Sequence, residues 1–145
     1  MNEVRILLVE DEPNDVELTM RALRRNAITA EVTVARDGAA ALAYLLGPGR
    51  EPEEALPPLP SLVLLDLNLP KIRGLDVLRR LRQDTRTRLL PVVILTSSRE
   101  EEDRRSGYLA GANSYIRKPV DFDEFLDVIR QLSAYWLSLN EPPPI

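Results

Sequence analysis

Short apolar runs alternate with segments of helical periodicity from one end of this chain to the other. Such strict alternation is typical of repeated strand–helix units, which build a parallel sheet with helices on both faces. Consecutive apolar residues within the runs support this, because a strand that is covered on both faces has no polar side. We therefore expect a doubly wound α/β sandwich with a five-stranded sheet. Its strands are predicted at Arg5–Glu10, Val32–Ala35, Leu62–Asp66, Pro91–Thr96 and Ser114–Arg117.

The length of 145 residues suits one domain of ordinary size. We place this domain at residues 1–139, with an extended last helix that starts near Asp121, and a short tail at 140–145. Residues 47–61 contain five prolines and two glycines, and this stretch is predicted to form a long surface loop.

Histidine and cysteine are both absent from the chain. Their absence excludes phosphohistidine carriers, histidine general bases, disulfides and zinc–thiolate sites. Any metal must therefore be held by oxygen ligands, which favours Mg2+, Mn2+ or Ca2+.

The charge of the chain restricts its partners. Its formal net charge is -4 and its pI is about 5.0. Nucleic acids and anionic membranes bind basic surfaces, so we expect neither as a partner. No apolar run is long enough to cross a bilayer, and the N-terminus lacks the features of a secretion leader. We therefore expect a cytoplasmic location.

Polar side chains stand at the carboxyl ends of four predicted strands. Glu10 and Asp11 close the first strand, Asp66 ends the third, Thr96 ends the fourth and Lys118 follows the fifth. In open α/β sheets this edge carries the functional site. If the strand order is 2-1-3-4-5, these ends are near neighbours. Each residue alone is more simply a helix cap or a loop residue, but the joint pattern over four strands indicates a site.

The types of side chain in this set suit phosphoryl transfer. Neighbouring carboxylates raise one another's pKa, and a divalent cation such as Mg2+ removes that conflict. The cation also accepts a phosphoryl oxygen and neutralises charge as transfer proceeds. One carboxylate with a free oxygen can then attack phosphorus and become an acyl phosphate. Lys118 and Thr96 can each hold a further phosphoryl oxygen.

Four blocks of sequence resemble the receiver domains of bacterial-type response regulators. They occur in the family's order and spacing, and the resemblance covers roughly residues 4–133. The four together are far more specific than any one of them alone. The blocks are ILLVED at 6–11, LLDLNLP at 64–70, VILTS at 93–97 and AGANSYIRKP at 110–119.

The resemblance implies a flavodoxin-like fold with strand order 2-1-3-4-5 and a role in a two-component phosphorelay. It implies that Asp66 accepts a phosphoryl group from a histidine kinase. It also implies a Mg2+ site. In that site Asp11 and Asp66 bind the ion directly, Asn68 binds it through its backbone carbonyl, and Glu10 acts through water.

The same resemblance implies a conformational switch. Thr96 matches the hydroxyl that turns toward the phosphate, and Tyr115 matches the aromatic residue that moves inward with it. Lys118 matches the phosphate partner, and its bond to Pro119 is cis in the family. Tyr115 could instead be only a core residue of the edge strand, but its position favours the switch role.

Three further features resemble the single-domain regulators that are paired with bacterial phytochrome kinases. They are the long loop at 47–61, the NLPK sequence at 68–71 and the YWLSL sequence at 135–139. This finer resemblance implies a phytochrome-type sensor histidine kinase as donor. Because no output domain accompanies the predicted domain, the signal would pass by contact with a downstream protein target or by onward transfer of the phosphoryl group.

The predicted last helix and its extension carry more apolar surface than one small sheet covers. Tyr135, Trp136 and Leu139 lie beyond the length that the fold needs. Excess apolar surface commonly marks a protein contact. We expect a homodimer through the last helix and the tail, with a tail folded back on its own domain as the alternative.

Three competing functions fit the sequence less well than a phosphoacceptor without enzymatic turnover. A Mg2+-dependent phosphatase with an aspartyl nucleophile needs a second acid two residues after Asp66, where this chain has Asn68. A flavodoxin-like cofactor binder needs a phosphate-cradling loop, whereas the loop after the first strand is acidic. A receiver that works without phosphorylation is disfavoured because the expected site positions are all filled.

Overall fold

The computed structural model describes residues 4–47 and 56–144. Strands and helices alternate as predicted, with boundaries that differ from the expected ones by a residue or two. Glu10 and Asp66, for example, lie just beyond the strands that they were expected to end. The elements are β1 (Arg5–Val9), α1 (Pro13–Arg25), β2 (Glu31–Ala35), α2 (Gly38–Leu46), β3 (Leu62–Leu65), α3 (Gly74–Gln83), β4 (Val92–Thr96), α4 (Glu101–Ala110), β5 (Ser114–Arg117), α5 (Phe122–Ala134) and the π-helical turn η2 (Tyr135–Leu139).

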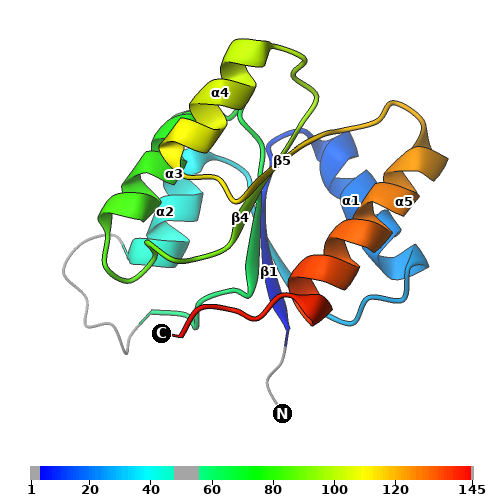
Figure 1. Ribbon diagram of the computed structural model, residues 1–145, viewed down its shortest axis with the longest axis horizontal. Helices are drawn as coiled ribbons and strands as arrows, with labels where there is room; N and C mark the ends of the chain where they lie inside the picture. Colours follow the sequence, from blue (N-terminus) through cyan, green and yellow to red (C-terminus); the bar gives the residue numbers. More distant parts are fainter. Residues whose placement is uncertain (1–3, 48–55, 145) are drawn as a thin grey trace.

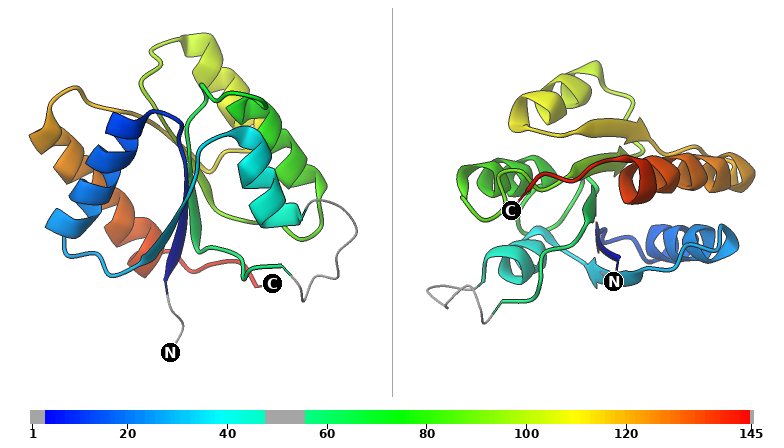
Figure 2. Two further views of the ribbon diagram at one scale, coloured as in Figure 1. Left: turned by 180° about the vertical axis from the view of Figure 1, so that it is seen from behind. Right: turned by 60° about the horizontal axis from the view of Figure 1, so that its bottom comes forward.

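The five strands form one parallel sheet in the order β2-β1-β3-β4-β5. Helices α1 and α5 cover one face of this sheet, and α2, α3 and α4 cover the other (Figure 1). The same three layers are visible in the turned views (Figure 2). The predicted flavodoxin-like, doubly wound sandwich is therefore confirmed.

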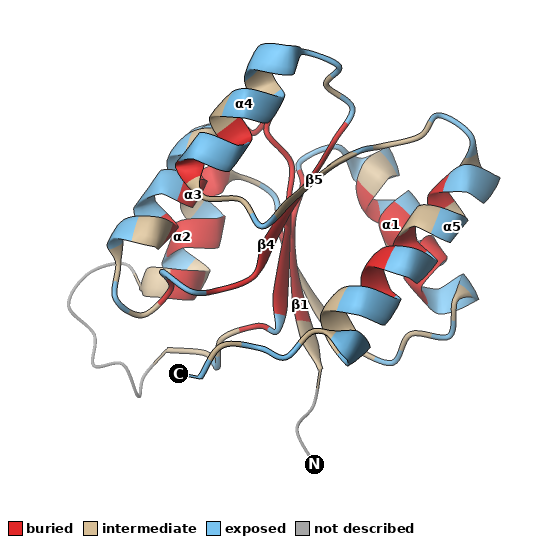
Figure 3. Ribbon diagram, in the orientation of Figure 1, coloured by how far each residue is buried: buried red, intermediate tan, exposed pale blue. Residues whose placement is uncertain are grey.

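The central strands are buried on both faces, as their unbroken apolar sequence indicates. Successive side chains of a strand point to opposite faces. In β1, Leu7 and Val9 join the core beneath α2 and α3, whereas Ile6 and Leu8 join the core beneath α1 and α5. The buried residues accordingly lie along the sheet and on the inward sides of the helices (Figure 3). The two cores hold the strand ends in a fixed register.

Side-chain caps set the starts of three helices. The Glu12 side chain accepts the backbone N–H of Asn14 at the start of α1, where Pro13 occupies the first turn. Asp37 caps α2 through the N–H of Ala40 at 2.7 Å. Asp121 caps α5 through the N–H of Glu124 at 3.2 Å, which confirms the start expected there.

Both ends of the described chain lie at the edge of the sheet where the strands begin (Figure 1). Trp136 and Leu137 pack against the core beneath α1 and α5, and the tail then crosses toward the start of β3 (Figure 2). There Pro142 and Pro144 line a pocket together with Leu59. Most of the loop expected at 47–61 lies outside the described residues. No helix in the described part of the chain is long and apolar enough to span a bilayer.

Candidate functional site

The register of the parallel sheet places Glu10 and Asp66 beside each other. Val9 pairs with Leu65 across β1 and β3, and Glu10 and Asp66 are the next residues along these two strands. The backbone N–H of Asp66 donates to the carbonyl of Val9 at 3.0 Å, and that of Glu10 donates to Ala35 at 3.0 Å. These hydrogen bonds carry the ladder one residue past the strands, so both carboxylates leave the sheet at the same edge.

Glu10, Asp11 and Asp66 each offer a carboxylate oxygen, and these three oxygens lie within 4.8 Å of one another. Glu10 and Asp66 are buried, and Asp11 is exposed to solvent. A set of carboxylates at this separation, open on one side, suits a divalent cation with oxygen ligands and bound water. The donor set therefore fits Mg2+ or Mn2+. Asn68, the expected main-chain ligand, lies exposed in the loop that follows Asp66.

Lys118 enters the site from the end of β5. Its backbone N–H donates to the carbonyl of Thr96 at 2.7 Å, which fixes the start of its side chain. Its ammonium forms an ion pair with Glu10 and a second one, at 3.2 Å, with Asp15. The Lys118 side chain is 11% exposed and that of Glu10 is 3% exposed, so their contact is made out of water. The Asp15 side chain is 36% exposed, so its contact with Lys118 lies closer to the surface.

The site shifts the pKa of both members of the buried pair. Burial is the largest influence on Glu10, and with the charge of Asp66 it raises the pKa of Glu10 to about 7, against the opposing effect of Lys118. For Lys118, burial disfavours the ammonium, but the hydrogen bond with Glu10 and the charge of Asp66 outweigh it and raise its pKa. Lys118 therefore keeps its positive charge, whereas burial disfavours the charged form of the neighbouring Glu10 carboxylate.

Asp66 keeps most of its carboxylate free. Its Oδ1 accepts the backbone N–H of Leu67 at 2.9 Å, and this is the one hydrogen bond to that carboxylate within the described residues. Gly74 approaches closely behind it, since a Cβ on Gly74 would lie 2.3 Å from the backbone oxygen of Asp66. The approach of α3 thus holds the backbone of Asp66 from behind while the side chain faces the other acids.

Thr96 and Tyr115 lie on the α4 side of the site. Thr96 is fully buried at the end of β4, and its hydroxyl accepts the N–H of Ser98 at 3.4 Å. The Tyr115 hydroxyl is buried without a hydrogen bond of ordinary geometry in the described structure. Burial raises the pKa of this hydroxyl. Tyr115 is thus turned inward here, with its ring against Gly107 of α4.

One expectation from the family resemblance is wrong for this structure. The bond between Lys118 and Pro119 is trans, and no cis peptide bond occurs among the described residues. The trans form is the lower in energy for most X–Pro bonds.

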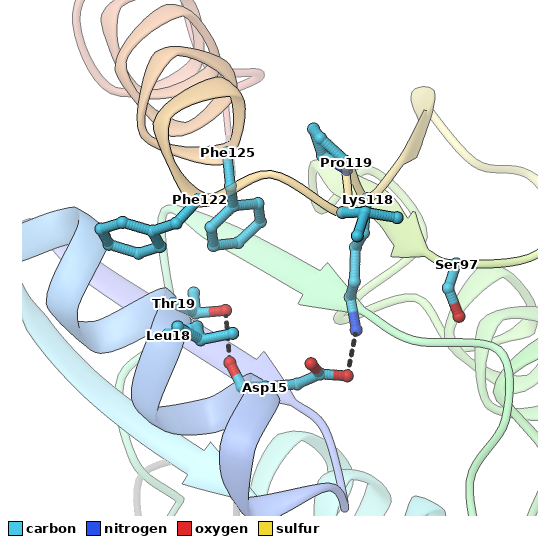
Figure 4. Close-up of a pocket in the computed structure, with 9 residues that line it drawn as sticks. Asp15, Leu18, Thr19, Ser97, Lys118, Pro119, Phe122 and Phe125 are labelled. Atoms are coloured by element: carbon cyan, nitrogen blue, oxygen red, sulfur yellow. Dashed lines mark hydrogen bonds and ion pairs between the residues drawn. The ribbon is translucent and has the colours of Figure 1, made fainter.

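A pocket of about 290 Å3 opens beside Lys118, between α1 and the start of α5. Figure 4 shows the Lys118 ammonium and the Asp15 carboxylate at one end of this pocket, and Phe122 and Phe125 at the other. Asp15 was not among the residues predicted from the sequence. An acid in the first turn of a helix is common for reasons of the helix dipole alone, so its sequence position gave no signal of a contact with Lys118.

Comparison with known families gives one match that spans most of the chain. Residues 6–130 match the family model described as the response regulator receiver domain. The matched stretch includes Glu10, Asp11, Asp66, Thr96 and Lys118.

Individual proteins with a similar sequence or structure support the same family. The probable methanogenesis regulatory protein FilR2 of Methanothrix harundinacea is 41% identical over 95% of this chain and 86% of its own. Response regulator Rcp1 of Synechocystis is 37% identical over 91% of this chain and 88% of its own. The crystal structure of its Mn2+-bound form superposes with a TM-score of 0.85, over 97% of this chain and 99% of that chain, at 35% identity. The phosphorylated cyanobacterial phytochrome response regulator RcpA superposes with a TM-score of 0.88 at 36% identity, over 99% of this chain and 100% of that chain.

Proposed function

Because the chain belongs to the response regulator receiver domain family, which acts in phosphorylation-based two-component signalling, we propose that Asp66 accepts the phosphoryl group. One observation carries this assignment. The Asp66 carboxylate is buried at a common edge with Glu10 and Asp11, and its charge acts on the Lys118 ammonium. An acid held among other acids that can bind a cation, and beside a buried ammonium, is suited to accept an anionic phosphoryl group.

The transfer is an in-line displacement. A free oxygen of Asp66 forms a bond to phosphorus as the bond between phosphorus and the donor breaks. With a phosphohistidine donor, the imidazole nitrogen leaves with the bonding electron pair and takes up a proton. The hydrogen bond from the Leu67 N–H holds Asp66 Oδ1 and leaves the second oxygen of the carboxylate for the attack.

Mg2+ is the proposed metal, held by Asp11 and Asp66, with the carbonyl of Asn68 and, through water, Glu10. The separation of the three carboxylates supports this site, as does the crystal structure of Rcp1 in its Mn2+-bound form. When bound, the ion neutralises charge that gathers on the phosphoryl oxygens during transfer. Lys118 takes another of these oxygens by leaving part of its contact with Glu10.

Thr96 and Tyr115 are the proposed switch. Thr96 ends the strand next to β3, and among the described residues its hydroxyl engages only the N–H of Ser98, at a long 3.4 Å. It is therefore held weakly enough to exchange this contact for a phosphoryl oxygen. Tyr115 packs on the adjacent α4 and β4, so a shift of Thr96 and the loop after it changes the space that the tyrosine ring occupies. A downstream protein would then bind the altered surface.

We propose a sensor histidine kinase of the phytochrome type as the donor. The support is the description of RcpA as a phytochrome response regulator, together with its coverage of nearly the whole chain. FilR2 carries a different description, so the kinase has to be identified by transfer from purified candidates. Because such a kinase draws its phosphate from ATP, the encounter takes place in the cytoplasm. We propose no turnover on small molecules, since the exposed Asn68 stands where a phosphatase places its general acid.

A homodimer through α5, η2 and the tail is the proposed assembly. Tyr135 and Leu139 are exposed at 48% and 73%, although Trp136 and Leu137 between them pack on the core of their own domain. Light scattering of a chain that ends after Ser133, and of Leu139→Asp, should give the mass of a monomer. Ser138→Asp, which adds the same charge at an exposed neighbouring position, should not. An unchanged mass in both Leu139→Asp and the shortened chain contradicts the dimer.

The test of the central proposal is intact mass with Mg2+ and acetyl phosphate. We expect a gain of one phosphoryl group that requires Mg2+ and is absent from Asp66→Asn. Asp76→Asn is the matched control, because Asp76 is an exposed aspartate of α3 that pairs with Arg79 at the surface. Uptake by Asp66→Asn equal to that of the parent would show that another residue is the acceptor.

A further inference from the structure

We propose that Asp15 is a positioning residue that holds Lys118 in place for the incoming phosphoryl group, an inference that rests on the proposed function of Asp66. The Lys118 ammonium is shared between two carboxylates, Glu10 just beyond β1 and Asp15 in the first turn of α1. Figure 4 shows the Asp15 carboxylate reaching the Lys118 ammonium from the first turn of α1. Asp15 lies outside the three-carboxylate cluster, so it is not one of the proposed metal ligands.

Asp15 is the rigid member of this contact. The start of α1 is held by Pro13 and by the bond from Asn14 to the Glu12 side chain. The buried hydroxyl of Thr19 donates to the carbonyl of Asp15 at 2.8 Å, which fixes the same turn one step further along. Lys118, in contrast, carries its charge on a flexible four-carbon stem that loses rotamer freedom when it is ordered. Asp15 therefore orders Lys118, rather than the reverse.

The donor count of Lys118 explains why two anchors are useful. An ammonium has three N–H donors, and Glu10 and Asp15 accept two of them. The third is left for a phosphoryl oxygen on Asp66, whose charge is close enough to act on Lys118. If Lys118 leaves Glu10 to meet the phosphoryl group, Asp15 still holds it near its starting position. The ammonium can then rotate about its contact with Asp15 and reach the phosphoryl oxygen without losing its position.

Two other roles for Asp15 predict different results. A purely structural role, as an acid that favours the start of α1, predicts a loss of stability with no effect on Lys118 or on phosphorylation. A competing role, in which Asp15 withholds Lys118 from the phosphoryl group, predicts faster phosphorylation when Asp15 is removed. The positioning role predicts slower phosphorylation with unchanged metal binding.

The sequence offers a direct view of Lys118, because the chain contains only two lysines. The other, Lys71, is 69% exposed and pairs with Asp37, so it serves as an internal reference. In protein labelled with 13C,15N-lysine, the NMR signals of the two side-chain termini can be followed separately. We expect Asp15→Ala to move the Lys118 signals and leave those of Lys71 in place. Glu17→Ala is the matched control, since Glu17 is an exposed acid of the same helix and pairs with Arg24.

Phosphorylation by acetyl phosphate at saturating Mg2+ completes the test. For Asp15→Ala we expect the maximal rate of phosphoryl uptake to fall about three- to tenfold, the range that a single hydrogen bond of ordinary strength gives. The Mg2+ dissociation constant should match that of the parent. Asp15→Asn should recover part of the rate, because its amide oxygen still accepts a hydrogen bond from Lys118. Thermal unfolding of each variant verifies that it is folded.

The outcomes separate this inference from the proposed function. If the parent takes up one phosphoryl group, and Asp15→Ala takes it up at the same rate or faster, the positioning role is wrong while Asp66 remains the acceptor. Lys118 signals that do not respond to Asp15→Ala overturn it as well. A parent that takes up no phosphoryl group overturns the proposed function, and the inference fails with it.

Discussion

The ion pair between Glu10 and Lys118 joins two strand ends that are not neighbours in the sheet. Glu10 follows β1 and Lys118 follows β5, with β3 and β4 between these strands. The two residues are 108 positions apart in the sequence. Their contact therefore depends on β1, β3, β4 and β5 being assembled, and the charge of Asp66 acts on both of its members.

The pH dependence of stability should report on Glu10. Burial raises its pKa from 4.5 to about 7, so the folded protein binds this proton more tightly than the unfolded chain. Its contribution to stability is therefore full below about pH 4.5 and is lost as the pH rises toward 7. In metal-free protein, we expect Glu10→Gln to remove about 1 to 3 kcal/mol of this decline. Urea unfolding with chelator at several pH values measures it, and parallel pH profiles for parent and variant contradict it.

Gly74→Ala should disturb the backbone that carries Asp66. Helix propensity alone would make this substitution in α3 stabilising. The added Cβ, however, would lie 2.3 Å from the backbone oxygen of Asp66 and 2.7 Å from the Cα of Leu67. Backbone atoms can move aside only at a cost in free energy. We expect a loss of about 1 to 3 kcal/mol in unfolding free energy and weaker Mg2+ binding. A variant at least as stable as the parent would mean that α3 shifts without strain.

Gly107→Ala should turn Tyr115 outward. The new Cβ would lie 2.8 Å from Ile94 Cδ1 and 3.2 Å from the Tyr115 ring, in the space that the ring now fills. Burial raises the pKa of the Tyr115 hydroxyl, so exposing it should lower that pKa toward its ordinary value. Absorbance titration of the chain's four tyrosines measures this, with Tyr115→Phe to assign the late component. If the component that titrates at the highest pH is unchanged in Gly107→Ala, the Tyr115 ring has stayed buried and the prediction is wrong.

The sequence predicted the fold and most of the site because both depend on local patterns. Unbroken apolar runs marked the strands, and the carboxyl-end rule then placed Glu10, Asp66 and Lys118 at one edge. Asp66 and Glu10 proved to lie one residue beyond their strands, although the backbone hydrogen bonds between strands continue to both residues.

Contacts between distant segments could not be predicted in this way. Asp15 resembles any acid at the start of a helix, and only the position of β5 reveals its contact with Lys118. In the sequence, Gly107 is only a residue of low helix propensity within α4. The structure shows that the Tyr115 ring packs against it. The tail is a similar case, because the sequence showed excess apolar surface but not that Trp136 and Leu137 pack on their own domain.

Arg82 should stabilise the end of the molecule opposite the site without affecting phosphorylation. From the last turn of α3, its guanidinium donates to the carbonyls of Gly111 at 2.9 Å and Thr87 at 3.1 Å, and to the side chain of Asn113 at 3.0 Å. Asn113 in turn accepts the N–H of Val92, so this one side chain connects α3, α4 and the starts of β4 and β5.

Arg82→Ala would leave several of these acceptors unpaired at once, and we expect a loss of roughly 2 to 4 kcal/mol in unfolding free energy. Arg82→Lys should recover only part of it, because an ammonium cannot reproduce the planar fork of donors. Arg80→Ala, at an exposed position of the same helix, should change stability by no more than about 0.5 kcal/mol. Denaturant unfolding and the acetyl phosphate assay should be run on the same samples. A stable Arg82→Ala protein would show that water replaces the guanidinium, whereas a folded variant with slow phosphorylation would show that this cluster acts on the site across the sheet.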